Sequence, residues 1–200
     1  MRIKSNTVAV VDDSAEVSKA ISLLLETVNL KTVVFTDPRA FLEADVGHAG
    51  CILLDVRMPE MSGLEVFRRM RDEYGSTVPI IFLTGHGEVG MAVKAMRAGA
   101  FDFLEKPVDD QVLIDSVLEA LKVDTERRAK NLRQLASRVL RDRLTSRESE
   151  IAQLLVEGLT SRDIAARLGL SVRTVEGYRS RLMIKLEITS LAKLVELLRT

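Results

Sequence analysis

The hydrophobic positions of the first 121 residues follow two alternating patterns. Short, almost continuous apolar runs occur at 8–11, 32–35, 51–54, 79–83 and 101–104. Between them, apolar residues recur every three or four positions, as at Val17, Ile21, Leu24 and Leu25. The runs predict buried strands and the intervening stretches predict amphipathic helices. Their strict alternation predicts βαβ units, and therefore a parallel sheet with helices on both faces.

The segment that follows is charged and lacks helix-breaking residues. The clearest helices before it are predicted at 63–74, 89–98 and 111–121. Residues 122–143 contain neither Pro nor Gly and carry only a thin apolar stripe, formed by Leu132, Leu135 and Val139. We expect a mostly helical linker that prolongs the preceding helix. Its polar faces favour a solvated, semi-rigid spacer, although the stripe also has the spacing for a partner helix.

Residues 144–200 show only the helical pattern. Four helices are predicted, and the first begins with a capping box in which Glu148 is the partner of Thr145. The predicted N-caps are Thr145, Thr160, Ser171 and either Thr189 or Ser190. Gly169 is expected to end the second helix.

Composition excludes several classes of protein. The chain has 200 residues and 46% hydrophobic content, enough for one large or two small globular domains. No apolar run approaches the roughly 20 residues that cross a bilayer, and the short apolar stretch near the N-terminus, broken by two aspartates, is a poor signal peptide. The single Cys51 allows no internal disulfide and is expected to be a buried small hydrophobe. We therefore expect a soluble, cytoplasmic protein that does not interact with membranes.

The formal net charge is zero, but its distribution is uneven. Residues 1–121 carry 12 Lys and Arg against 19 Asp and Glu. Residues 122–143 carry 8 against 3, and residues 144–200 carry 9 against 7. An acidic front and a basic rear indicate two modules, of which the rear one is a candidate for nucleic-acid binding.

Polar side chains follow four of the predicted strands. They are Asp12 with Asp13, Asp55, Thr84, and Lys106 before Pro107. The carboxyl ends of parallel strands meet at one edge of a sheet, so these side chains should gather there. Crowded carboxylates repel one another, and a divalent cation such as Mg²⁺ relieves the repulsion. No glycine-rich nucleotide-binding motif follows the first strand, whereas a lysine and a hydroxyl suit a phosphoryl group.

Four separate motifs resemble the receiver domain of two-component response regulators. They are VAVVDD at 8–13, CILLDVRMPEMSG at 51–63, IIFLTGHG at 80–87 and AFDFLEKP at 100–107. The resemblance covers about residues 5–121. It implies an α/β, flavodoxin-like, doubly wound sheet of five parallel strands in the order 2-1-3-4-5.

The resemblance also implies a role for each strand-end residue. Asp55 would be the phosphoacceptor. Asp12, Asp13, the Asp55 carboxylate and the backbone carbonyl of Arg57 would hold Mg²⁺. Lys106 would pair with the phosphoryl oxygens.

Two further residues would report phosphorylation. By the same resemblance, Thr84 would donate a hydrogen bond to a phosphoryl oxygen, and Phe103 would turn into the space that Thr84 vacates. The family commonly has a cis peptide bond at the step that corresponds to Lys106–Pro107. His86 is interpreted as a loop histidine and not as a base.

The rear module has the sequence of a helix-turn-helix. Residues 160–179, TSRDIAARLGLSVRTVEGYR, combine helix, glycine-containing turn and helix. With its flanks, this segment resembles the four-helix DNA-binding domain of the LuxR type. The whole chain is therefore similar to response regulators of the NarL/FixJ family. The implied organisation is a receiver at 1–121, a linker at 122–143 and a DNA-binding domain at 144–200.

A helical wheel divides the third predicted helix of the rear module into two faces. Val175, Leu182 and Leu186, with Tyr178 beside them, should face the core. The residues expected to read base edges are Arg173, Glu176, Gly177, Ser180 and Arg181. Those expected to contact phosphates are Thr174, Arg179 and Lys185. Glu176 can accept a hydrogen bond from cytosine, and Arg179 lies nearest the packed side.

The implied function is phosphorylation-controlled transcription regulation, not enzymatic turnover apart from the receiver's own phosphorylation and dephosphorylation. Expected partners are a sensor histidine kinase, promoter DNA, RNA polymerase and, after phosphorylation, a second copy of the chain. Two alternatives stay open. One is a phosphorelay or phosphatase-type receiver, and the other is a DNA-binding regulator independent of phosphorylation.

Overall fold

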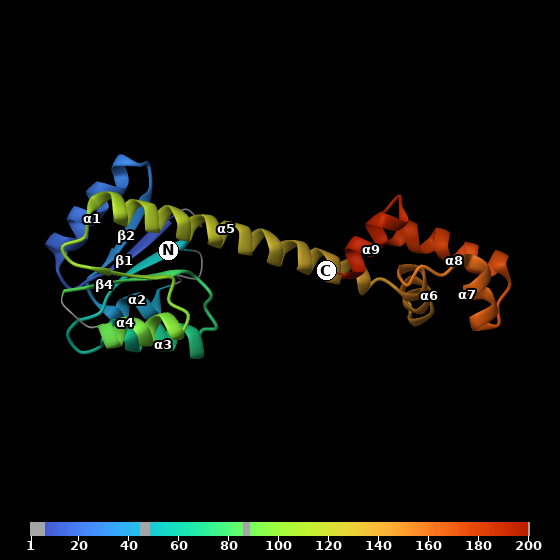
Figure 1. Cartoon of the computed structure of the whole chain (residues 1–200), viewed down its shortest axis with the longest axis horizontal. Helices are drawn as coiled ribbons and strands as arrows, with labels where there is room; N and C mark the ends of the chain where they lie inside the picture. Colours follow the sequence, from blue (N-terminus) through green and yellow to red (C-terminus); the bar gives the residue numbers. More distant parts are fainter. Residues whose placement is uncertain (1–6, 45–48, 86–88, 200) are drawn as a thin grey trace. The chain divides into compact units, whose positions relative to one another are not determined.

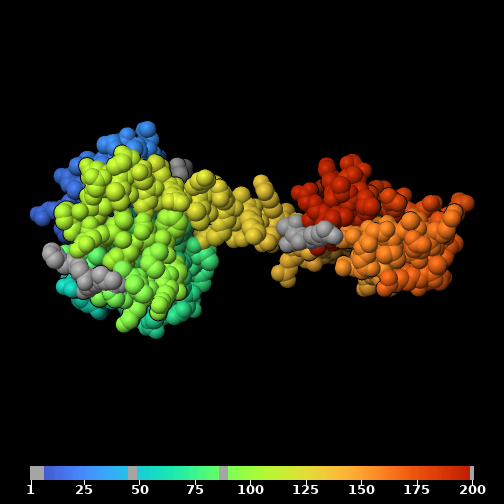
Figure 2. Space-filling view, viewed as in Figure 1, coloured from blue at the N-terminus to red at the C-terminus, as the bar shows by residue number. Residues whose placement is uncertain are grey.

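A computed structural model describes residues 7–44, 49–85 and 89–199. The chain divides into two compact units, and the boundary lies between Arg127 and Arg128. Figure 1 shows the first unit as a sheet with helices and the second as helices alone. In Figure 2 the first unit runs from blue to green and most of the second from orange to red. None of the helices in the described part of the chain is long and apolar enough to span a membrane.

Five parallel strands form one sheet in the first unit. They are β1 (Thr7–Val11), β2 (Lys31–Phe35), β3 (Cys51–Asp55), β4 (Ile80–Thr84) and β5 (Asp102–Glu105). Their spatial order is β2-β1-β3-β4-β5, which confirms the order predicted from the sequence. Three central strands, β1, β3 and β4, are buried along their whole length, which explains why they read as continuous apolar runs.

Five helices begin in this unit. They are α1 (Ala15–Thr27), α2 (Pro38–Glu43), α3 (Gly63–Asp72), α4 (Val89–Arg97) and α5 (Asp110–Arg141). Only α2 was not predicted. The Asp37 carboxylate caps it by accepting a hydrogen bond from the Arg39 amide at 2.8 Å, and Pro38 occupies its first turn. An Asp-Pro pair before a helix is a recognisable start signal, but six residues are too few to show a helical period.

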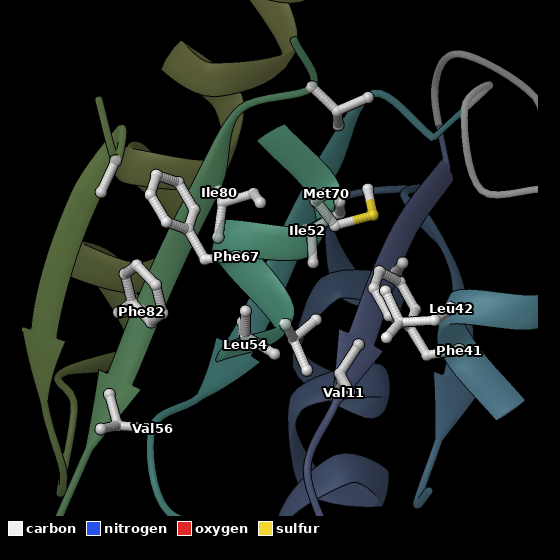
Figure 3. Packing of buried hydrophobic residues seen from close by; sticks show 14 of the residues in the cluster. Val11, Phe41, Leu42, Ile52, Leu54, Val56, Phe67, Met70, Ile80 and Phe82 are labelled. Carbon is white, nitrogen blue, oxygen red and sulfur yellow. The ribbon is translucent and has the colours of Figure 1, made fainter. Parts of the chain in front are cut away.

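The sheet separates two hydrophobic cores. One face packs against α2, α3 and α4, with Phe41, Phe67 and Phe82 among the buried residues. In Figure 3 the rings of Phe67 and Phe82 lie close together, and their centroids are 5.5 Å apart in an edge-to-face contact. The other face packs against α1 and the start of α5 through Leu25, Val117 and their neighbours. Figure 1 shows these helices on opposite sides of the sheet.

The second unit contains α6 (Ser146–Val156), α7 (Ser161–Leu168), α8 (Val172–Lys185) and α9 (Leu191–Arg199). Their start signals behave as predicted. Thr145 and Glu148 form the capping box of α6, and the Thr160 and Ser171 side chains cap α7 and α8. Ser190 caps α9, because its hydroxyl accepts from the Lys193 amide at 3.3 Å.

A left-handed residue and a shared core set the angle between α7 and α8. Gly169 ends α7 with φ of 65°, a conformation that glycine adopts at no steric cost. Ile164 of α7 and Val175 and Leu182 of α8 are fully buried in one cluster with α6 and α9. The described helix-turn-helix is thus held rigidly by packing on both sides of its turn.

Candidate functional site

The carboxyl edge of the sheet brings the predicted residues to neighbouring strand ends. Asp55 is the last residue of β3, and Thr84 is the last residue of β4. Asp12 directly follows β1, which pairs with β3. Lys106 directly follows β5, and its amide donates to the Thr84 carbonyl at 2.6 Å. The Lys106–Pro107 bond is cis, as the resemblance implied.

Lys106 joins two buried carboxylates. Its Nζ donates to Asp12 Oδ2 and to Asp55 Oδ1, both at 2.6 Å. Asp12 is 1% and Asp55 5% exposed. The second oxygen of Asp55 accepts from the Arg57 amide at 2.7 Å, and that of Asp12 accepts from the Ser14 amide at 2.9 Å. These bonds fix the direction of both side chains.

The electrostatics show that the site is short of positive charge. Burial raises the pKa of Asp55, and the hydrogen bond and charge of Lys106 only partly oppose this effect. For Lys106, burial lowers the pKa of the ammonium, but the bonds to Asp12 and Asp55 outweigh it, so the net shift is upward. Two desolvated carboxylates therefore share one ammonium, an arrangement that a further cation would stabilise.

The predicted metal ligands are only partly assembled. Asp13 is exposed, and the ion pairs of Lys106 at the sheet edge are with Asp12 and Asp55. Within residues 7–44, 49–85 and 89–199, no three His, Cys, Asp or Glu side chains lie close enough to hold a metal ion. The chemistry of the donors nevertheless fits Mg²⁺, because the hard carboxylate oxygens of Asp12 and Asp55 are adjacent and share a single ammonium group.

The side-chain hydroxyl of Thr84 is buried and forms no hydrogen bond with the described residues. The residue is 2% exposed, and its Oγ1 has no hydrogen-bond partner among the described residues. An unpaired buried hydroxyl is unfavourable by about 1–3 kcal/mol, so the atom is suited to a ligand oxygen. On the adjacent strand, Phe103 is half-buried with its ring 5.9 Å from that of Phe82. His86 lies outside the described residues.

Gly63, the first residue of α3, contacts the backbone of Asp55. A Cβ built on Gly63 would lie 2.1 Å from the Asp55 carbonyl oxygen, which is far inside van der Waals contact. The Gly63 amide also donates to the Val56 carbonyl at 3.0 Å. The start of α3 therefore packs directly against the residue that carries the central carboxylate.

A second candidate site is the exposed face of α8. The predicted base-reading residues are all exposed: Arg173, Glu176, Gly177, Ser180 and Arg181. Val175 and Leu182 on the other side are fully buried, as the wheel predicted. The Arg181 guanidinium lies 4.6 Å from the centroid of the Tyr178 ring, a cation–π contact that restricts its direction.

The predicted phosphate-contacting residues are less uniform. Thr174 is exposed, and its hydroxyl lies 2.8 Å from that of Ser171. Arg179 is half-buried. Lys185 donates to Glu148 Oε2 at 2.6 Å, so any phosphate contact competes with this pair. The pair could not be predicted from the sequence, because its members are 37 residues apart.

Glu148 is the central acceptor of this connection between α6 and α8. Its side chain is 4% exposed and also accepts from the amide and hydroxyl of Thr145. Lys185, with help from Thr145, lowers the pKa of Glu148 to about 2. Lys185 thereby holds the position of α8 in the unit.

Comparison with known proteins assigns a family to each of the two units. Residues 8–118 match the response regulator receiver domain, and residues 142–198 match the bacterial regulatory proteins of the luxR family. The chain therefore belongs to the response regulators, as a two-component transcription regulator with receiver and LuxR-type DNA-binding domains.

Within that family the chain is of the NarL/FixJ type. It is 40% identical to the transcriptional regulatory protein FixJ of Azorhizobium caulinodans over 97% of this chain and 92% of the relative. It is 37% identical to the response regulator protein TmoT of Ectopseudomonas mendocina over 98% and 89% of the two chains. The solved structure of the response regulator StyR is similar with a TM-score of 0.86 and 38% identity, covering 96% of this chain and 98% of that one.

Proposed function

We propose that Asp55 accepts a phosphoryl group from a sensor histidine kinase and that this modification controls DNA binding by α8. The observation that carries the proposal is the arrangement at the sheet edge. A buried carboxylate is held by Lys106, and an unpaired buried hydroxyl, Thr84 Oγ1, belongs to the neighbouring strand. Together they supply a nucleophile, a cation and a hydrogen-bond donor for one tetrahedral group.

In the proposed transfer, an Asp55 oxygen attacks phosphorus and forms an acyl phosphate, while the bond from phosphorus to the kinase histidine breaks. Asp12, Asp13, Asp55 and the Arg57 carbonyl would hold Mg²⁺, which neutralises phosphoryl charge when bound. Lys106 would move from carboxylate to phosphoryl oxygens. The Arg57 amide already donates to Asp55 and keeps the other carboxylate oxygen oriented.

The added group carries a charge of about −1.5 to −2 and three acceptor oxygens. Thr84 would donate to one of them and Phe103 would move into the vacated volume, which favours a conformation present before phosphorylation. We place the resulting dimer contact on α4 and β5. Val93 and Met96 of α4 are each 45% exposed, so this helix offers an apolar surface to a second copy.

In the proposed DNA complex, α8 lies in the major groove. Arg173, Glu176 and Arg181 would contact base edges, and Thr174 and Arg179 phosphates. Lys185 would keep its bond to Glu148 unless a phosphate displaces it. Promoter DNA and RNA polymerase are the partners of this unit.

Labelling with acetyl phosphate tests the receiver half of the proposal. Asp55→Asn should abolish incorporation, because an amide oxygen does not form a stable acyl phosphate, and the exposed Asp72→Asn should leave it unchanged. Full stoichiometric labelling of Asp55→Asn would refute the site. If acetyl phosphate does not change the affinity for DNA, a regulator independent of phosphorylation is favoured. If the protein is labelled but binds no DNA specifically, a phosphorelay role is favoured.

Binding to a duplex selected from random sequence tests the DNA half. Arg173→Ala and Arg181→Ala should each weaken specific binding by about 1–3 kcal/mol, because a base-contacting arginine contributes that much discrimination. Arg68→Ala, which removes an exposed charge from α3, is the matched control. Equal affinity of all three variants at physiological salt would show that the reading face is assigned wrongly.

A further inference from the structure

The part of α5 that belongs to the second unit carries an apolar stripe that no described residue covers. Leu132, Leu135 and Val139 are 67%, 59% and 51% exposed. The opposite side of the same helix packs against the second unit, because Leu140 contacts the hydrophobic core of that unit and Ser137 is buried. Folding of the second unit therefore leaves this stripe free.

The spacing of the stripe is that of a coiled-coil seam. Its members are separated by three and then four residues, which corresponds to positions a, d and a of a heptad. Surface helices that face a globular core usually have a wider apolar stripe. A narrow a/d line of exposed leucine and valine instead suits a single facing helix.

The surface of the seam contains a hole of the kind that such packing needs. Arg128, Asn131, Leu132 and Leu135 line a hollow of about 280 Å³. These residues stand at i, i+3, i+4 and i+7, the diamond of four into which one side chain of a facing helix inserts. In heptad terms they are positions d, g, a and d, which together receive a side chain from position a of the partner.

We propose that this seam binds the same seam of a second copy of the chain, as a short, parallel, in-register pair of helices. Leu132 of each copy would fill the hollow beside Leu132 of the other. Val139 at a and Leu135 at d are the residue types that favour two parallel strands, and Leu132 occupies the other a position. The flanking e positions are Ala129 and Ala136, whose small side chains allow the two helices to approach closely.

The seam is short, which limits its strength. The preceding seam positions are Thr125 and Arg128, and the following one is Asp142. Three apolar side chains per helix bury far less than the roughly 1,200 Å² of a stable interface. The contact therefore forms mainly when another contact holds two copies at an effective concentration of about 1 mM. It rests on the proposed α4–β5 dimer, so phosphorylation favours it by holding two copies together, although no seam residue contacts the phosphorylation site.

Single cysteines in the full chain, treated with acetyl phosphate so that the proposed α4–β5 dimer forms, provide the test. Leu132→Cys, Leu135→Cys and Val139→Cys should each yield disulfide-linked dimers with copper phenanthroline, because equivalent a and d positions face each other in a parallel pair. The control is Val123→Cys, an exposed apolar position, 43% exposed, on the opposite side of α5. The native Cys51 does not interfere, because it is fully buried and burial raises the pKa of its thiol.

Combined variants separate the seam from the phosphorylation site. Adding Leu135→Gln to Leu132→Cys should lower the cross-linking rate at least about tenfold, since glutamine keeps the helix but removes the apolar contact. Adding Asp55→Asn should leave the ranking of the four cysteine positions unchanged.

Three results would overturn the pairing. Seam cysteines that cross-link no faster than Val123→Cys would show that there is no contact. Cross-linking of only one of the three would indicate antiparallel helices. Thiols that resist maleimide without forming dimers would show that another segment of the same chain covers the seam.

Discussion

Gly177 offers a prediction in which stability and DNA binding change in opposite directions. It lies in the interior of α8, where glycine is less favourable than alanine by about 1 kcal/mol. A Cβ at this position meets nothing within 4 Å among the described residues. Gly177→Ala should therefore stabilise the second unit by about 1 kcal/mol with no steric penalty.

The size of the stabilisation determines the assay. For a domain of 60–100 residues, about 1 kcal/mol raises the melting temperature by about 4–8 °C. Calorimetry of the full chain should show this rise in the transition of the second unit only. If α8 lies in the major groove with Gly177 toward the bases, the added methyl group should also weaken binding to the selected duplex.

The matched control is Ser149→Ala on the exposed side of α6, which improves helix propensity by about 0.5 kcal/mol away from α8. It should raise the same transition and leave DNA affinity unchanged. A Gly177→Ala protein that melts no higher would refute the helix argument. One that melts higher and binds DNA equally well would show that Gly177 is not at the interface.

Two other variants test the buried polar groups. Thr84→Val should leave the unphosphorylated protein equally or more stable, because the lost hydroxyl has no partner among the described residues, while the DNA-binding response to acetyl phosphate should decline; a clear loss of thermal stability would contradict this. Glu148 has a pKa of about 2 in the folded chain and about 4.3 when unfolded. Its pair with Lys185 therefore stabilises above about pH 4 and is lost toward pH 2. In Glu148→Gln, the melting temperature of the second unit should no longer fall in this pH range. An unchanged dependence of that melting temperature on pH would show that the pair does not contribute to stability.

The strand order followed from the resemblance to receiver domains, but the gathering of Asp12, Asp55 and Lys106 could be predicted for a physical reason. Buried parallel strands must be apolar along their length, so the first polar residue after each run marks the same edge of the sheet. Predicted strand boundaries differ from the observed ones by no more than one residue. The capping residues Thr145, Thr160 and Ser171 of the rear helices were equally predictable, because their bonds span only three positions.

Features that depend on distant contacts could not be predicted in this way. The Glu148–Lys185 bond joins two helices whose residues are far apart in sequence. The unpaired Thr84 hydroxyl is defined by what surrounds it and not by its neighbours in the chain. Helix α2 was too short for a periodic signal, although Asp37 and Pro38 marked its start.

The close approach of Gly63 to Asp55 has a consequence for signal transmission. There is no room for even a methyl group between Gly63 and the Asp55 carbonyl oxygen. The start of α3 and the backbone of Asp55 should therefore move together. In the proposed phosphorylated state, the group added to Asp55 would therefore displace the side chains of Thr84, whose hydroxyl has no partner among the described residues, and of half-buried Phe103 more readily than α3. The close contact at Gly63 thus makes the α3 side of Asp55 rigid and leaves the β4–β5 side as the one that can rearrange.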